Sequence, residues 1–210
     1  MDLSRPLSLI TPSLDGDVLA LLAAAHVKLS GREISRRIGA SQEGVRRVLE
    51  RLVADGIVLL ERAGAAHLYQ LNREHLAASA IEHLTGMRTE LLDRLRRAID
   101  AWTIAPAAAV LFGSVARGDA KPSSDIDLLV VRPRAVDGDN LEWRRQLTDL
   151  VVCTKAMTGN DTRIVEYSYD DARALGRNER VLAAAAHDGI PLSGSLRAFI
   201  TDSRKKGTRR

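Results

Sequence analysis

The residue types most able to do chemistry stand close together between Val110 and Val131. Asp125 and Asp127 are two residues apart in an apolar, strand-like run, so their side chains leave the same face of that strand. Two carboxylates this close repel one another and raise each other's pKa unless a cation lies between them. Mg²⁺ suits such a pair, because it takes oxygen ligands and is usually shared between one or two protein carboxylates and substrate phosphates. The pair is therefore a candidate magnesium site.

A Gly-Ser step precedes the aspartates at a defined distance. Gly113 and Ser114 follow an apolar run at 107–112, and ten residues separate Ser114 from Asp125. We expect this step to begin a helix, whose exposed N–H groups and dipole favour an anion. Gly113 has no side chain to obstruct a phosphate, and the Ser114 hydroxyl can add a hydrogen bond. The Gly-Ser loop is predicted to hold phosphates, and the aspartates to hold the metal that bridges them.

The elements that must position these residues alternate between strand and helix. Alternation of this kind predicts an α/β layer in which helices pack against a sheet. We predict strands at 107–112, 125–132 and 163–168, helices at 140–158 and 171–188, and a last strand-like segment at 189–194.

This spacing, together with Arg117-Gly118 after the Gly-Ser step, resembles the signature of the DNA polymerase β-like nucleotidyltransferase superfamily, particularly its minimal prokaryotic branch. The resemblance covers about residues 91–196. It implies two Mg²⁺ ions, held by three carboxylates, that align an acceptor hydroxyl with the α-phosphate of an NTP, so that NMP is transferred and pyrophosphate leaves. It assigns the metals to Asp125 and Asp127, and the terminal phosphates to Gly113 and Ser114.

The third carboxylate is predicted to be Glu166, the only acidic residue inside the strand at 163–168. The family more often has aspartate there, and two alternatives stay open: Asp161, or no third ligand. Without a third ligand, catalysis becomes doubtful while nucleotide binding survives. Arg117 is a candidate phosphate ligand that could instead pair with Asp119.

The N-terminal part has a different rhythm. Helices are predicted at 16–27, 31–39 and 42–55, and two strand-like runs at 57–62 and 67–72 form a hairpin around 63–66. Three helices and a hairpin in this order resemble the winged helix-turn-helix of bacterial MarR-like and ArsR-like regulators, over about residues 15–72.

That resemblance implies that the third helix enters the DNA major groove while the hairpin touches the backbone. Residues 1–75 hold ten Lys or Arg and nine Asp or Glu, so a dimerisation or docking role remains the alternative to DNA binding. The predicted groove-facing residues are Ser41, Gln42, Glu43, Arg46 and Arg47, and those near phosphates are Arg36, Arg37, Arg51 and Arg62.

The predicted domains are a winged helix-turn-helix at 1–75, a helical linker at 76–102, a nucleotidyltransferase sheet with flanking helices at 103–200, and a basic tail at 201–210. Gly86 is the predicted boundary within the linker. The linker's apolar stripe, which includes Leu91, Leu95 and Ile99, is expected to pack on the second domain's sheet and is also a candidate homodimer seam.

Composition limits the other classes. The net charge is +4, but residues 204–210 of the tail carry five positive charges, so residues 1–203 carry −1 and are not basic. The tail is either an aid to phosphate binding or a disordered end. Because no run approaches the roughly 20 apolar residues of a membrane span, we expect a cytoplasmic protein without a membrane partner. The single cysteine, Cys153, excludes an internal disulfide and is expected to be buried.

Three functions follow. The first is an Mg²⁺-dependent enzyme that places NMP on a protein, an RNA end or a small molecule, with a toxin-like protein partner or an RNA acceptor supplied in trans. The second is a winged-helix transcriptional regulator whose nucleotidyltransferase domain is a nucleotide sensor or a dimerisation module. The third, a drug-modifying nucleotidyltransferase, is disfavoured by the winged helix and by the lack of an acidic, aromatic-lined region.

Overall fold

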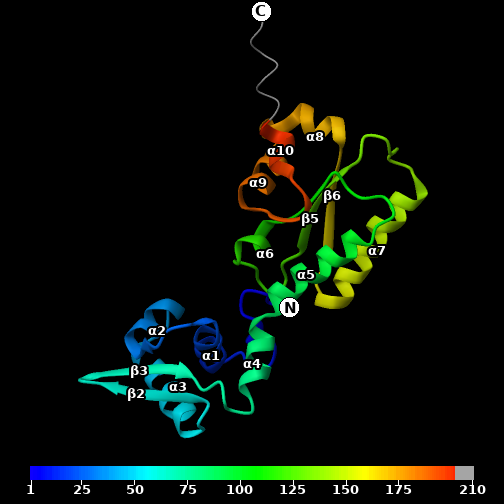
Figure 1. Ribbon diagram of the computed structural model, residues 1–210. Helices are drawn as coiled ribbons and strands as arrows, with labels where there is room; N and C mark the ends of the chain where they lie inside the picture. Colours follow the sequence, from blue (N-terminus) through cyan, green and yellow to red (C-terminus); the bar gives the residue numbers. More distant parts are fainter. Residues whose placement is uncertain (202–210) are drawn as a thin grey trace, which may run out of the picture. The chain divides into compact units, whose positions relative to one another are not determined.

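The computed structural model describes residues 1–201, in two compact units (Figure 1). One unit consists of Asp2 and Ser4–Arg88, and the other of Met1, Leu3 and the chain from Thr89 onward. Each unit has its own buried apolar core. The predicted basic tail lies outside the described residues, apart from Thr201 at the end of the last helix.

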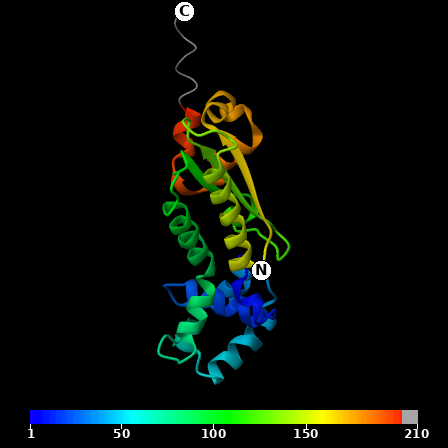
Figure 2. The same ribbon diagram turned by 90° about the vertical axis from the view of Figure 1, so that its right-hand side faces the viewer.

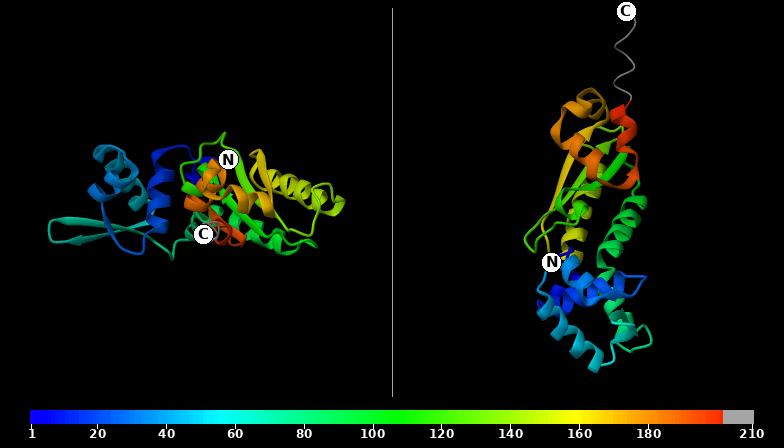
Figure 3. Two further views of the ribbon diagram at one scale, coloured as in Figure 1. Left: turned by 90° about the horizontal axis from the view of Figure 1, so that it is seen from above. Right: turned by 90° about the vertical axis from the view of Figure 1, so that its left-hand side faces the viewer.

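In the N-terminal unit, three helices and a hairpin lie where the sequence predicted them. The sheet has the order β1-β3-β2 and is antiparallel. Figure 3 shows the hairpin of β2 and β3 extending beyond the helices of its unit. The elements are η1 (Pro6–Leu9), α1 (Leu14–Ala24), β1 (Leu29–Ser30), α2 (Gly31–Ile38), α3 (Gln42–Ala54), β2 (Val58–Ala63), β3 (Ala66–Leu71) and α4 (Ala78–Thr85).

Local signals in the sequence delimit α2 and α3. The Ser30 hydroxyl accepts a hydrogen bond from the Glu33 N–H, and the Ser41 hydroxyl accepts one from the Gly44 N–H at 3.1 Å. Serine at the N-cap satisfies one of the amide groups that a helix start leaves free. The apolar positions of these helices then meet in one core, where Ile34, Val45 and Leu49 are almost completely buried.

The predicted linker contains two helices that belong to different cores. Helix α4 ends before Gly86, and α5 (Met87–Asp100) begins directly after it. Ala78 and Ile81 of α4 are buried in the core of the N-terminal unit. Leu91, Leu95 and Ile99 of α5 are buried in the core of the C-terminal unit, against its sheet. The apolar stripe of α5 therefore packs on the sheet, as expected.

The C-terminal unit is built on a four-stranded sheet with the order β6-β5-β4-β7. Strand β5 is parallel to β6 and antiparallel to β4, which is in turn antiparallel to β7. The elements are β4 (Ala108–Phe112), α6 (Gly113–Arg117), β5 (Ile126–Arg132), α7 (Leu141–Thr158), β6 (Thr162–Ser168), α8 (Tyr169–Leu175), η2 (Gly176–Asn178), α9 (Arg180–Asp188), β7 (Ile190–Gly194) and α10 (Leu196–Thr201).

Helices cover both faces of this sheet. Helices α5 and α7 lie side by side over one face, where they enclose Leu128 and Val130 of β5 (Figure 2). Residues of α8, α9 and α10 enclose Leu129 and Val131 on the other face. A strand buried on both faces is apolar at nearly every position, which explains the run from Leu128 to Val131. The two aspartates stand where this burial ends.

Two further expectations can be compared with the structure. Cys153 is exposed on α7, so the expectation that it is buried was wrong; its neighbours Leu150 and Thr154 face the interior instead. Within residues 1–201, every helix is too short or too polar to cross a membrane.

Candidate functional site

The aspartate pair lies where β5 begins. Asp127 stands opposite Phe112, the last residue of β4, and also opposite Arg163 of β6. Asp125 immediately precedes β5, two residues from Asp127, and therefore leaves the same face. The predicted shared face is thus consistent with the strand geometry, and it is the face that carries Leu129 and Val131.

Gly113 lies directly against Asp127. Gly113 has a φ of +75°, in the left-handed region that favours glycine. A β-carbon at this position would overlap Oδ2 of Asp127 and would lie 3.3 Å from its Cγ. Glycine is therefore required both by the backbone and by the carboxylate. This contact brings the Gly-Ser step and the aspartate pair together, as the sequence predicted.

Ser114 lies in the first turn of α6, but this helix is short. It contains five residues and ends at Gly118, whose N–H bonds back to the Ser114 carbonyl at 3.0 Å. A helix of one turn has little dipole to offer an anion. Phosphate binding here would depend on the N–H groups of the Gly-Ser step and on the Ser114 hydroxyl.

The negative charge of the aspartate pair is only partly compensated by neighbouring cations. The pKa of Asp127 is raised, mainly because burial disfavours the charged form and next because Asp125 repels it, while Arg163 and Arg117 act in the opposite direction. A cation bound between the two carboxylates would remove this repulsion. The electrostatics of the pair therefore favour a cation.

Arg163 is a member of this site that the sequence reasoning missed. Its Nε forms an ion pair with Oδ2 of Asp125 at 2.8 Å, and its side chain is 73% exposed. It stands opposite Asp127 across the parallel ladder. Strand alternation predicts that residues 163, 165 and 167 share one face of β6, but the sequence alone does not say which face meets the aspartates.

Glu166 does not join the pair, and the prediction that it is the third metal ligand was wrong. It stands opposite Val130, and so leaves the face of the sheet that α7 covers. The indole N–H of Trp143 donates to its carboxylate at 3.0 Å, and Arg132 and Arg144 pair with it at 2.8 and 3.1 Å. Glu166 is an anchor between β6 and α7.

Asp161, the alternative third ligand, is close in sequence but otherwise engaged. Its carboxylate pairs with Lys155 at 2.7 Å, and a hydrogen bond from Lys155 is the main reason that its pKa is lowered. Its carbonyl accepts the N–H of Ile126 at 2.8 Å, which joins the starts of β5 and β6. Among the described residues, no three acidic, histidine or cysteine side chains are grouped to hold a metal.

The donor set of Asp125 and Asp127 can hold a divalent cation. Asp125 and Asp127 supply oxygen ligands, and phosphate and water oxygens would complete the shell, as is usual for Mg²⁺. The position opposite Asp127 holds the cationic Arg163. Arg117 pairs with Asp119 at 3.2 Å, which was the alternative to its binding a phosphate. The Arg117 guanidinium also lowers the pKa of Asp127.

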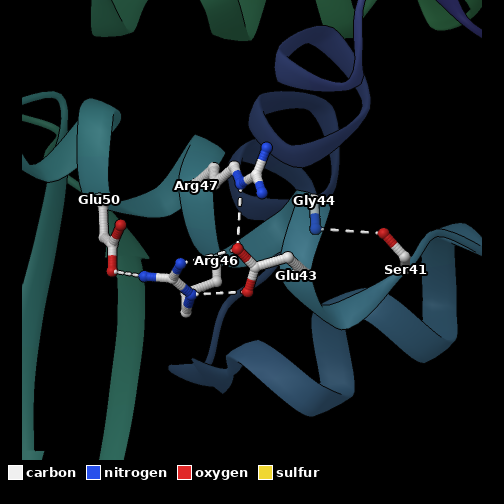
Figure 4. Close-up of polar contacts among 6 residues, drawn as sticks. All are labelled: Ser41, Glu43, Gly44, Arg46, Arg47 and Glu50. Atoms are coloured by element: carbon white, nitrogen blue, oxygen red, sulfur yellow. Dashed lines mark hydrogen bonds and ion pairs between the residues drawn. The ribbon is translucent and has the colours of Figure 1, made fainter.

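The N-terminal unit contains the predicted DNA-contacting residues. Arg46 pairs with Glu43 at 2.7 Å and also with Glu50, and Arg47 pairs with Glu43 at 3.0 Å (Figure 4). These contacts hold the pKa of Glu43 at about 2, chiefly through the hydrogen bond from Arg46. The Ser41 hydroxyl is occupied as the N-cap of α3.

Of the remaining predicted DNA-contacting residues, three arginines pair with acids and two residues are exposed. Arg36 and Arg37 both pair with Glu33, and Arg51 pairs with Asp15. Gln42, at the start of α3, and Arg62, on β2, are exposed. The predicted DNA-contacting residues are thus rich in arginine, but most of these arginines pair with neighbouring acids.

Comparison with known proteins assigns the C-terminal unit to a class. Residues 90–177 match the family model for the nucleotidyltransferase domain, and the match includes the Gly-Ser step and both aspartates. The prediction of a nucleotidyltransferase is confirmed at this level: the chain carries a nucleotidyltransferase domain. No curated protein matches the chain.

Three solved structures resemble parts of the chain. A toxin–antitoxin crystal structure with AMP-PNP is 20% identical, with a TM-score of 0.36 over 54% of this chain and 82% of that one. A mutant of the toxin–antitoxin MntA–HpeT is 16% identical, with a TM-score of 0.37 over 53% and 82%. Human N-acetylserotonin methyltransferase with SAM is 19% identical, with a TM-score of 0.29 over 47% and 30%. At these TM-scores, none of the three similarities carries an argument about function.

Proposed function

We propose that this protein is an Mg²⁺-dependent nucleotidyltransferase that moves NMP from an NTP to a hydroxyl of a macromolecule, protein or RNA, supplied in trans. The observation that carries the proposal is the close contact of Gly113 with Asp127, which brings the N–H groups of the Gly-Ser step next to the carboxylate pair. A loop that admits phosphates next to two carboxylates is what a metal–nucleotide complex requires.

The residues would divide the work as follows. The N–H groups of Gly113 and Ser114, with the Ser114 hydroxyl, bind and orient terminal phosphates, and Asp125 and Asp127 hold one Mg²⁺. When bound, that ion neutralises charge on the phosphates and lowers the barrier to displacement at the α-phosphate. Positioning supplies much of the remaining rate enhancement, since a hydroxyl held in line with the α-phosphate reacts as if intramolecular.

We further propose that the N-terminal unit is a winged helix that binds DNA. Three observations support this: helix α3 capped by Ser41, the sheet order β1-β3-β2, and the projecting hairpin with Arg62 on its surface. Arg46 and Arg47 must leave Glu43 to reach phosphates or bases. The unit would then bring the transferase to an operator or to its target. With a toxin-like partner in trans, the whole chain would act as an antitoxin.

Label transfer tests the enzyme proposal. Purified protein is incubated with Mg²⁺, cell extract and each NTP labelled at the α-phosphate, beside a γ-labelled control and an Asp125→Asn, Asp127→Asn double variant. We expect α-label, and not γ-label, on a macromolecule only with the wild-type protein, and the labelled band then identifies the acceptor class. Absence of α-label with all four NTPs would overturn the transferase proposal.

A second function is favoured by one observation. Neither Glu166 nor Asp161 completes a carboxylate triad with the pair. A nucleotide sensor that regulates DNA binding through the N-terminal unit needs the phosphate loop and one cation, but no triad. If Mg²⁺ and NTP bind while no label moves, and NTP changes the affinity for DNA, the sensor is the function.

A further inference from the structure

Arg163 occupies the one position on β6 that faces the aspartate pair directly. Residue 163 is opposite Asp127 in the parallel ladder, and its guanidinium reaches across to Asp125 at 2.8 Å. The pairing also affects Asp127, because Arg163 is the largest of the influences that lower its pKa. One guanidinium thus balances part of the charge of both carboxylates.

The pairing is not a structural anchor. The Arg163 side chain is 73% exposed, and an ion pair in solvent contributes little to stability. The contrast with Arg132, which is 18% exposed and pairs with Glu166 on the opposite face, is plain. An arginine held this loosely can exchange one anionic partner for another, and its fork of N–H donors matches phosphate as well as carboxylate.

We propose that Arg163 is a phosphate-binding residue of the nucleotide site that takes the place of a second metal ion. Its ion pair with Asp125 competes with cations for that carboxylate. When a nucleotide enters with one divalent cation, the cation takes the carboxylates and the guanidinium turns to the triphosphate. This inference rests on the proposed function, because it assumes that the pair receives a metal–nucleotide complex.

Charge balance supports one cation. Two carboxylates and one guanidinium leave a single net negative charge at the pair. A second divalent ion would have to lie beside the guanidinium on the same face of the sheet, where like charges repel. The cationic Arg163 and the absence of a third acidic ligand among the described residues therefore both favour one bound cation over two.

The role predicts effects of opposite sign on two ligands. Removing the guanidinium frees Asp125, so a cation alone should bind more tightly; it also removes a phosphate contact, so a polyphosphate should bind more weakly. Mn²⁺ and inorganic tripolyphosphate are suitable probes, because neither depends on the base preference and no transfer can occur.

The experiment compares wild type, Arg163→Ala, Arg163→Asp and a control, Arg145→Ala. Arg145 is 74% exposed and pairs with Asp149 at 3.7 Å on α7, so the control matches the exposure and the loss of an ion pair. Binding of free Mn²⁺ is followed by electron paramagnetic resonance, and binding of tripolyphosphate in saturating Mn²⁺ by calorimetry, with circular dichroism to verify folding.

For Arg163→Ala we expect Mn²⁺ affinity to rise about threefold or more, and tripolyphosphate affinity to fall about tenfold, with one Mn²⁺ per chain in the wild type. Arg163→Asp should bind Mn²⁺ still more tightly, and the control should match the wild type. If the wild type binds both probes and Arg163→Ala binds them equally well, this inference is wrong while the proposed function stands. If the wild type binds neither probe, both this inference and the proposed function are wrong.

Discussion

Gly113 and Asp127 are in direct contact across the ends of β4 and β5, and the glycine has a positive φ. The contact is the reason that the phosphate loop and the carboxylate pair form one site. Any side chain at position 113 must displace the Asp127 carboxylate or move the loop, so the residue has consequences for cation binding as well as for stability.

We expect Gly113→Ala to weaken Mn²⁺ binding at least tenfold and to lower the free energy of unfolding by about 1–2 kcal/mol from backbone strain, with more from the overlap. Urea unfolding and Mn²⁺ titration measure the two effects. Gly118→Ala is the matched control, because Gly118 has a φ of +81° with nothing within 4 Å of its β-carbon position. Equal Mn²⁺ affinity in both variants would contradict the carboxylate contact.

The raised pKa of Asp127 predicts a pH dependence with a definite sign. An acid whose pKa is higher in the folded chain stabilises the fold most below its unfolded pKa, ordinarily 3.8, and less as pH rises through the folded value. In metal-free buffer, Asp127→Asn should therefore equal the wild type in stability at pH values below the unfolded pKa of the aspartate. At pH values above its folded pKa, the variant should be more stable than the wild type. Urea unfolding across the acid to neutral range gives the difference.

Asp161→Asn provides a control of opposite sign. The pKa of Asp161 is lowered, chiefly by its hydrogen bond from Lys155, so its contribution is present above the unfolded pKa and is lost as pH falls through the folded value. This variant should be less stable than the wild type near neutrality and approach it in acid. Parallel pH profiles for the two variants would contradict the assignment of Asp127.

Glu166→Gln should reduce stability without affecting cation binding. The glutamine can still accept from Trp143, but Arg132, which is mostly buried, loses its charged partner. We expect a loss of about 1–3 kcal/mol in the free energy of unfolding. Asp149→Asn, which breaks a pair between side chains at least 70% exposed, should lose under about 1 kcal/mol. A tenfold loss of Mn²⁺ affinity in Glu166→Gln would restore Glu166 as a ligand.

The fate of Glu166 shows what the sequence could predict. Apolar runs located the strands of the C-terminal sheet, and the two-residue spacing placed Asp125 and Asp127 on one face. The face of β6 was not predictable, because Ile164 and Val165 are both apolar and alternation therefore does not distinguish its two sides. The parallel register of β5 and β6 depends on how α7 packs over the sheet, which is a tertiary property. Because the sequence does not define the orientation of β6, it did not reveal that Arg163, and not Glu166, lies beside the aspartates.

The arginines of α3 are the opposite case, because their contacts could be predicted from the sequence. Glu43 stands three and four residues before Arg46 and Arg47, and side chains at these spacings are neighbours on a helix. Their pairing was therefore readable from the sequence, whereas their assignment as groove-facing residues treated them as free cations. Neutralisation by Glu43 is consistent with the near balance of charge in residues 1–75.

The same pairing gives the last prediction: Glu43→Gln should strengthen binding to DNA. The change releases Arg46 and Arg47 from a shared carboxylate, although Glu50 still holds Arg46. Each arginine that gains a phosphate should steepen the dependence of log affinity on log salt by about 0.9. Fluorescence anisotropy with a labelled duplex from the protein's own upstream region, at several salt concentrations, measures both quantities.

Glu90→Gln is the matched control, because Glu90 is as exposed as Glu43 and pairs with Arg94 at 2.7 Å on α5, outside the N-terminal unit. It adds the same charge to the chain, so any general electrostatic gain appears in both variants. Arg46→Ala with Arg47→Ala should weaken binding and lower the salt slope. If Glu43→Gln and Glu90→Gln bind DNA equally, and the double arginine variant binds as the wild type does, α3 is not the DNA-contacting helix and the unit is a docking module.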